Sequence, residues 1–167
     1  MSSSDFWVSS DRPEEDHWFL GTLATIKAPA AGTGGALSIV EFLHPPGFTT
    51  PRHVHHRSDE AFYVLSGSIR GFCGEQTWEA GAGAFVWLPK GVPHGYQVDD
   101  AASADAVRTL ALTLPGGFDR FVAEVGEPAP RPGLPEALVM PDISVLLAAA
   151  ANDGQEILGP PPGATGP

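Results

Sequence analysis

The sequence is poor in the residues that would define several classes of protein. It has one cysteine, Cys73, so no disulfide can form within the chain, and a reducing compartment is indicated. Its nine lysines and arginines stand singly among 20 acidic residues, which gives a net charge of −11 and no basic stripe for nucleic acid. No apolar run reaches the length of a membrane span, and the first residues lack the features of a signal peptide. We therefore expect a cytoplasmic protein with neither a membrane nor a nucleic-acid partner.

Glycine and proline, by contrast, are plentiful, with 20 and 17 residues in a chain of 167. They separate short apolar runs rich in β-branched and aromatic side chains, a pattern typical of many short strands joined by turns. The length suits one domain with a modest core, and the sequence contains no internal repeat. The sequence therefore predicts a single, mainly β domain.

Two histidines one residue apart, His53 and His55, are the most informative feature of this chain. Side chains at positions i and i+2 of a strand point to the same face, so the two imidazoles converge if residues 52–56 are extended. Glu60 follows a short polar turn and leads into the apolar run 61–65, which reads as the next strand. We expect the two strands to pair antiparallel and so to place Glu60 beside the two rings.

His94 follows a second apolar segment, residues 83–93, in which glycines and prolines mark a short strand and a tight turn. Three imidazoles and one carboxylate make a first coordination shell for a divalent transition metal. The predicted metal ligands are therefore His53, His55, Glu60 and His94. His56 should point to the opposite face of its strand, and His17 and His44 are interpreted as ordinary polar residues.

The glycines and prolines around these four residues resemble the two sequence motifs of the cupin family. The first motif is matched at every defined position by Gly47-x5-His53-x-His55-x4-Glu60-x6-Gly67. The second is matched by Gly83-x5-Pro89-x-Gly91-x2-His94, except that Val98 stands where the family has asparagine. This position is not a ligand position in the family. The resemblance implies an all-β, jelly-roll barrel (a double-stranded β-helix) in which those four residues bind the metal.

The resemblance also suggests how one domain is organised along the chain. Residues 1–46 are expected to supply N-terminal strands of the barrel, and residues 47–114 to form the cupin core with both motifs. Residues 115–158 are expected to form a short helical C-terminal extension, because Phe118, Phe121, Val122 and Val125 make a helical stripe and 141–151 reads as a second helix. Residues 159–167, and the apolar pair before them, are expected to form no regular structure, as a flexible Pro/Gly tail.

The flanking segments narrow the resemblance to small bacterial single-domain cupins similar to quercetin 2,3-dioxygenase. These segments include the opening Trp-Phe-Leu-Gly-Thr-Leu at residues 18–23 and the stretch Leu-Pro-Gly-Gly-Phe-Asp-Arg-Phe at residues 114–121. The resemblance implies an oxidoreductase that deprotonates a flavonol-like hydroxyl and adds dioxygen to the ring. Related small cupins serve secondary metabolism as polyketide cyclases, isomerases or dehydratases.

Four protein ligands leave one or two positions open on a five- or six-coordinate metal, unlike a closed structural site. The ligand set suits Ni, Fe, Mn, Co, Cu or Zn, and the sequence does not choose among them. Glu60 is both a metal ligand and the candidate catalytic base. Three hypotheses follow: a dioxygenase acting on a flavonol-like or other enolisable aromatic, a non-redox cyclase, isomerase or dehydratase in polyketide biosynthesis, and a non-catalytic ligand-binding cupin.

The walls of the predicted pocket indicate the class of ligand. Phe62 and Val64 share a strand face with Glu60, and Tyr96 and Val98 share one with His94. Phe85 and Trp87 share one face of their strand, but the sequence does not show which face. These six are the predicted substrate-binding residues, although each is also compatible with ordinary barrel core. An apolar, aromatic lining favours a flat aromatic or polyketide-like ligand over a sugar phosphate.

The sequence also offers one segment for self-association. Cupins commonly form homodimers in which an N-terminal strand joins the partner's sheet, and Asp5-Phe6-Trp7-Val8 is apolar enough for that role. The same segment is equally compatible with packing on its own barrel. We expect a homodimer.

Overall fold

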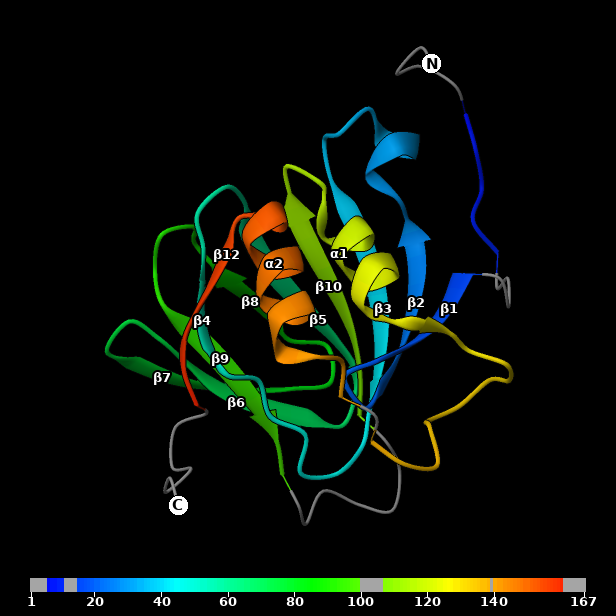
Figure 1. The fold of residues 1–167 in the computed structure, drawn as a ribbon. Coiled ribbons are helices and arrows are strands. Elements are labelled where there is room, and N and C mark those ends of the chain that lie inside the picture. Colours follow the sequence, from blue (N-terminus) through cyan, green and yellow to red (C-terminus); the bar gives the residue numbers. More distant parts are fainter. Residues whose placement is uncertain (1–5, 11–14, 100–106, 139, 161–167) are drawn as a thin grey trace.

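The computed structural model describes residues 6–10, 15–99, 107–138 and 140–160. These residues form two antiparallel sheets that face each other, with two helices along one flank (Figure 1). The seven-stranded sheet has the spatial order β11 (Glu127–Pro128), β1 (Asp16–Phe19), β2 (Thr22–Ala28), β3 (Ser38–His44), β10 (Val107–Leu114), β5 (Asp59–Ser66) and β8 (Phe85–Leu88). The five-stranded sheet has the order β12 (Gln155–Gly159), β4 (Arg52–His55), β9 (His94–Val98), β6 (Ser68–Cys73) and β7 (Gln76–Gly81). The predicted all-β jelly roll is confirmed.

The core lies between the two sheets because inward and outward side chains alternate along each strand. β3 shows the alternation clearly, since its residues 38, 40, 42 and 44 are buried and those between them are partly exposed. Apolar side chains from both sheets fill the interior, among them Val40, Phe62, Val64 and Val98. Burying one side chain of this size stabilises a fold by about 1.5–3 kcal/mol. The space between the sheets is therefore a packed interior into which the motif residues also project.

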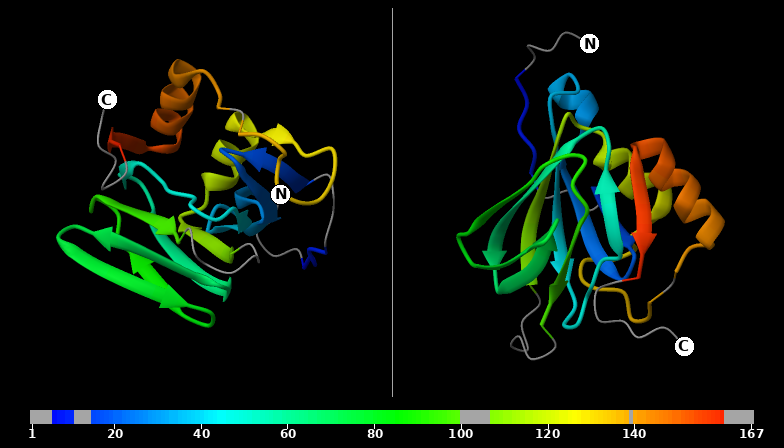
Figure 2. Two further views of the ribbon diagram at one scale, coloured as in Figure 1. Left: turned by 90° about the horizontal axis from the view of Figure 1, so that it is seen from below. Right: turned by 90° about the vertical axis from the view of Figure 1, so that its left-hand side faces the viewer.

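Helices α1 (Phe118–Val125) and α2 (Ile143–Asp153) pack against each other on the flank near β3 and β12 (Figures 1 and 2). The predicted stripe on α1 is confirmed, because Phe118, Phe121 and Val122 are buried. Asp142 caps α2, since its carboxylate accepts a hydrogen bond of 2.7 Å from the backbone N–H of Ser144. Within the described ranges, neither helix has the length and apolar character needed to cross a bilayer.

Two local predictions from the sequence are wrong. β4 and β5 do not pair with each other, because the turn between them crosses from the five-stranded to the seven-stranded sheet. The apolar residues before the Pro-rich tail do form regular structure: β12 pairs antiparallel with β4, in the register Gln155 to His55 and Ile157 to His53. At the other end, residues 6–8 form no strand within this chain, and the indole of Trp7 donates a hydrogen bond of 2.9 Å to the carbonyl of Gly32, which agrees with the alternative that this segment packs on its own barrel. Asp5 lies outside the described residues.

The pairing of β12 with β4 has a physical cause. The edge of β4 would expose a row of backbone N–H and C=O groups, and β12 satisfies them. The residues that carry the first motif are thus held by the C-terminal end of the chain as well as by β9. The C-terminal extension is therefore part of the framework of the motif residues and not an appendage.

Candidate metal site

The four predicted ligands come together from both sheets in the interior of the sandwich. His53 and His55 project from β4, His94 from the adjacent strand β9, and Glu60 from β5 in the opposite sheet. His53 and His94 are direct cross-strand partners. All four side chains are buried, and one ligand atom from each lies within 4.8 Å of those of the other three. This is a cluster that could hold one metal ion.

Backbone carbonyls orient two of the imidazoles. Nδ1 of His53 donates to the carbonyl of Pro51 at 2.9 Å, and Nδ1 of His94 donates to the carbonyl of Val92 at 2.9 Å. A carbonyl can only accept, so each Nδ1 carries a proton and each Nε2 is the nitrogen through which the ring would bind a metal. A second partner that fixes the tautomer of a histidine in this way is the usual arrangement around a bound metal.

The third imidazole, that of His55, lacks hydrogen-bond partners among the described residues, and a metal would supply a partner for one of its nitrogens. Both ring nitrogens of His55 are buried and have no hydrogen-bond partner. Its Nε2 lies 3.6 Å from Oε2 of Glu60, whereas Nε2 of His94 lies 3.1 Å from the same oxygen. Leaving a buried polar atom unpaired costs about 1–3 kcal/mol. A divalent cation coordinated by Nε2 of His55 would supply the missing partner, so the residues present fit a metal.

The protonation states of the cluster also favour metal binding. Burial lowers the pKa of His53 below its usual range, and it lowers that of His55 to about 4. Burial alone would lower the pKa of His94 too, but the hydrogen bond and the charge of Glu60 raise it. Burial raises the pKa of Glu60, yet the three imidazoles outweigh it and bring that pKa to about 2. Near neutral pH the cluster therefore presents a carboxylate and the neutral imidazoles of His53 and His55, while His94 would release the proton on its Nε2 when a metal binds.

The structure brings four of the six predicted substrate-binding residues into the interior. Phe62, Val64, Tyr96 and Val98 are buried there, and the rings of Phe62 and Tyr96 are 4.8 Å apart. Phe85 and Trp87 are not part of this group, which corrects the prediction. They lie on the outer face of β8, with exposed fractions of 59% and 48%.

The orientation of β8 follows from its register with β5. Glu60 is opposite Leu88 and Phe62 is opposite Val86, so these residues share the inner face. Tyr63 is opposite Phe85, and both are exposed on the outer face. The inward-facing positions of β8 are therefore Val86 and Leu88.

Sequence reasoning missed one interior residue, His44 at the end of β3. Its side chain has an exposed fraction of 0%, and its Nε2 is 3.1 Å from Oγ1 of Thr109. Its Nδ1 is buried without a partner. The sequence does indicate that His44 is buried, because it lies two and four residues after Phe42 and Val40 and so shares their strand face. It gives no indication of a functional role, because His44 lies outside both motifs.

Acid should destabilise the protein partly through His44. Burial lowers the pKa of His44 to about 3, so between that value and about 6.5 the unfolded chain binds a proton that the folded chain does not. The contribution of His44 to the free energy of unfolding is fully present above pH 6.5. It falls by about 1.4 kcal/mol per pH unit as the pH decreases toward 3. We expect urea unfolding of the metal-free protein to show a shallower loss of stability between pH 7 and 4.5 for His44→Gln than for wild type. The exposed His56, changed to glutamine, is the matched control, and an unchanged pH dependence in His44→Gln would contradict the account.

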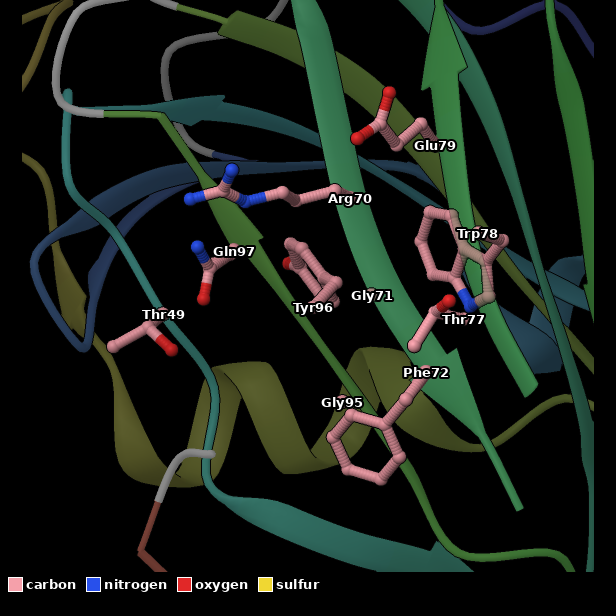
Figure 3. A pocket seen from close by; sticks show the side chains of 10 residues that line it. All are labelled: Thr49, Arg70, Gly71, Phe72, Thr77, Trp78, Glu79, Gly95, Tyr96 and Gln97. Atoms are coloured by element: carbon pink, nitrogen blue, oxygen red, sulfur yellow. The ribbon is translucent and has the colours of Figure 1, made fainter. Parts of the chain in front are cut away.

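A cavity of about 380 Å³ lies elsewhere, on the five-stranded sheet (Figure 3). It is lined by residues of β6, β7 and β9, including Arg70, Trp78, Tyr96 and Gln97, and by none of the four clustered side chains. Arg70 is half exposed and pairs with Asp99 at 2.9 Å. This surface cavity is therefore distinct from the cluster.

Comparison with known proteins agrees with the fold. The family model of the cupin domain matches residues 40–108. KdgF from Halomonas sp. is 20% identical, with a TM-score of 0.52 over 60% of this chain and 85% of that one. Pac13 from Streptomyces, described as a nucleoside dehydratase, is 15% identical, with a TM-score of 0.53 over 70% and 88%. Oxalate decarboxylase from Bacillus subtilis is 20% identical, with a TM-score of 0.51 over 60% and 27%.

Among curated proteins, none matches the chain at a significant level. At such identities the resemblance to solved structures establishes the fold, while the matched segment contains all four clustered residues. Two antiparallel sheets, both motifs and the family model agree on one assignment. Residues 40–108 match the cupin domain, and the chain has the jelly-roll fold of the cupins.

Proposed function

We propose that this protein is a metal-dependent enzyme, a quercetinase-like dioxygenase that acts on a flavonol-like or other enolisable aromatic substrate. The observation that carries the proposal is the buried cluster of His53, His55, Glu60 and His94, in which both nitrogens of His55 have no hydrogen-bond partner among the described residues. The aromatic interior beside the cluster supports a flat, apolar substrate. The proposed cofactor is one divalent transition metal.

In the proposed reaction the chain binds, orients and deprotonates the substrate. The metal, when bound, lowers the pKa of a coordinated hydroxyl group. Glu60 is ionised and buried, and we assign it as the acceptor of the hydroxyl proton once the metal has lowered the pKa of that hydroxyl. Phe62, Tyr96 and Val98 are buried in the same interior and would exclude water from the enolate that results. Dioxygen is the second substrate.

A second candidate is a non-redox metal enzyme, a cyclase, isomerase or dehydratase in natural-product biosynthesis. The resemblance to Pac13, which is described as a nucleoside dehydratase, favours it at the level of the fold. The same four residues would then hold a metal that acts only as a Lewis acid. Glu60 acts as the base in both candidate functions, so the two differ in whether the reaction consumes oxygen.

Oxygen uptake tests the proposal. The purified protein, with its metal identified by elemental analysis, is mixed with quercetin in an oxygen electrode. We expect consumption of oxygen that stops after treatment with a chelator and returns when the metal is restored. Turnover of an aromatic or polyketide-like substrate without oxygen would support the second candidate. Metal-dependent binding without turnover across substrate classes would indicate a non-catalytic binding protein.

A further inference from the structure

The interior contains a second buried polar group that the proposed chemistry does not use. His44 is fully buried, and only one of its two ring nitrogens has a partner, the hydroxyl of Thr109. Within the part of the chain that the structure describes, its Nδ1 has no hydrogen-bond partner. An unpaired atom of this kind costs about 1–3 kcal/mol, which a partner from outside the chain would recover. The free nitrogen is therefore a candidate contact for a ligand.

His44 is buried in the same interior as the metal cluster. Tyr96 is two residues along β9 from His94 and points to the same face, and its ring is 5.6 Å from that of His44. Phe62 stands in the same relation to Glu60 on β5, and its ring is 4.8 Å from that of Tyr96. Two residues of a strand span about 7 Å. A ligand of two or three fused or linked rings is long enough to reach from the cluster to His44.

Aromatic rings surround the imidazole. The ring of Phe42 is stacked on it at 5.5 Å, with an interplanar angle of 21°. Phe48 lies at 4.9 Å and Tyr96 meets it edge-on at 5.6 Å. The surroundings therefore favour a planar group, and the burial that lowers the pKa of His44 to about 3 keeps the imidazole neutral near pH 7. A neutral ring pairs best with an uncharged hydroxyl or carbonyl.

We propose that His44 is a substrate-positioning residue whose Nδ1 makes a hydrogen bond to a hydroxyl or carbonyl group at the end of the substrate remote from the metal. The proposal rests on the proposed function, because it assumes that the substrate binds at the cluster. It narrows the substrate class to planar polycyclic aromatics that carry oxygen at both ends. Compounds with a single polar end would lack the second contact.

Two substitutions separate the nitrogens of His44. The amide of an asparagine reaches about the position of Nδ1, and the amide of a glutamine reaches about that of Nε2. His44→Asn thus keeps the proposed ligand contact and loses the bond to Thr109, while His44→Gln does the reverse. Thr109→Val is a third variant, which leaves His44 intact and removes only the partner of Nε2.

The experiment titrates quercetin into the zinc-loaded protein without oxygen and follows the absorption of the flavonol. We expect His44→Gln to weaken binding about tenfold, the value of one net hydrogen bond. His44→Asn and Thr109→Val should stay within about threefold of wild type, and zinc content should be the same in all four proteins. A merely structural role predicts the opposite order, because the bond to Thr109 would then decide the outcome.

The results discriminate between the two proposals. If wild type binds quercetin and His44→Gln binds it equally well, the role of His44 is overturned and the proposed function stands. If His44→Asn is as weak as His44→Gln, the role of Nδ1 is likewise overturned. If zinc-loaded wild type does not bind quercetin at all, both the flavonol-like substrate class and the role assigned to His44 are refuted.

Discussion

Alanine at His53, His55 or His94 is expected to reduce the affinity for a divalent transition metal at least about 100-fold. Changing a residue that only makes a hydrogen bond to a metal ligand lowers metal affinity about 10–100-fold. Each of these substitutions removes a ligand itself, so its effect should be larger. The loss should be large at all three positions, since each imidazole is buried and contributes one atom to a set within 4.8 Å. Elemental analysis after dialysis against a weak chelator measures it.

His56→Ala is the matched control for this series. It removes a neighbouring histidine whose side chain is more than half exposed and pairs with Glu156 at 2.8 Å on the surface. Metal content should equal that of wild type. Circular dichroism and thermal unfolding of each variant separate loss of metal from loss of fold. Full retention of metal in all three cluster variants would refute the site.

The sequence predicts the candidate site well because the spacing rules are local. His53 and His55 share a face as their one-residue separation requires, and their rings are 5.2 Å apart. The two motifs also bring His94 and Glu60 to the same point. The partner strands, however, are a property of the whole topology. Glu60 reaches the cluster from the opposite sheet and not from a hairpin with β4, which no local pattern reveals.

The remaining errors have the same origin. Because side chains alternate between the two faces of β8, Phe85 and Trp87 must share a face. Only the pairing of Glu60 with Leu88 shows that this face is the outer one. Likewise, the apolar residues of β12 form a strand because the edge of β4 is available for pairing. Strand propensity depends on such context more than helix propensity does. The stripe of α1, which is local, is predicted correctly.

Glu60→Gln is expected to reduce the turnover number about 10²–10⁴-fold while changing metal content by less than about tenfold. A glutamine keeps one oxygen that can coordinate a metal, but it cannot accept a proton near neutral pH. General-base catalysis contributes an effect of that size, and Glu60 is the ionised carboxylate inside the cluster, 3.1 Å from His94. Steady-state kinetics on metal-saturated enzyme, together with elemental analysis, separate the two roles.

Asp59→Asn provides the matched control, because it makes the same chemical change one residue away. The carboxylate of Asp59 accepts a hydrogen bond of 2.9 Å from the backbone N–H of Lys90 in an exposed position and lies outside the cluster. Turnover in this variant should stay within about twofold of wild type. Equal losses of metal and turnover in Glu60→Gln would make Glu60 a ligand only. The base would then have to come from elsewhere, since the other clustered groups among the described residues are the three imidazoles that would hold the metal.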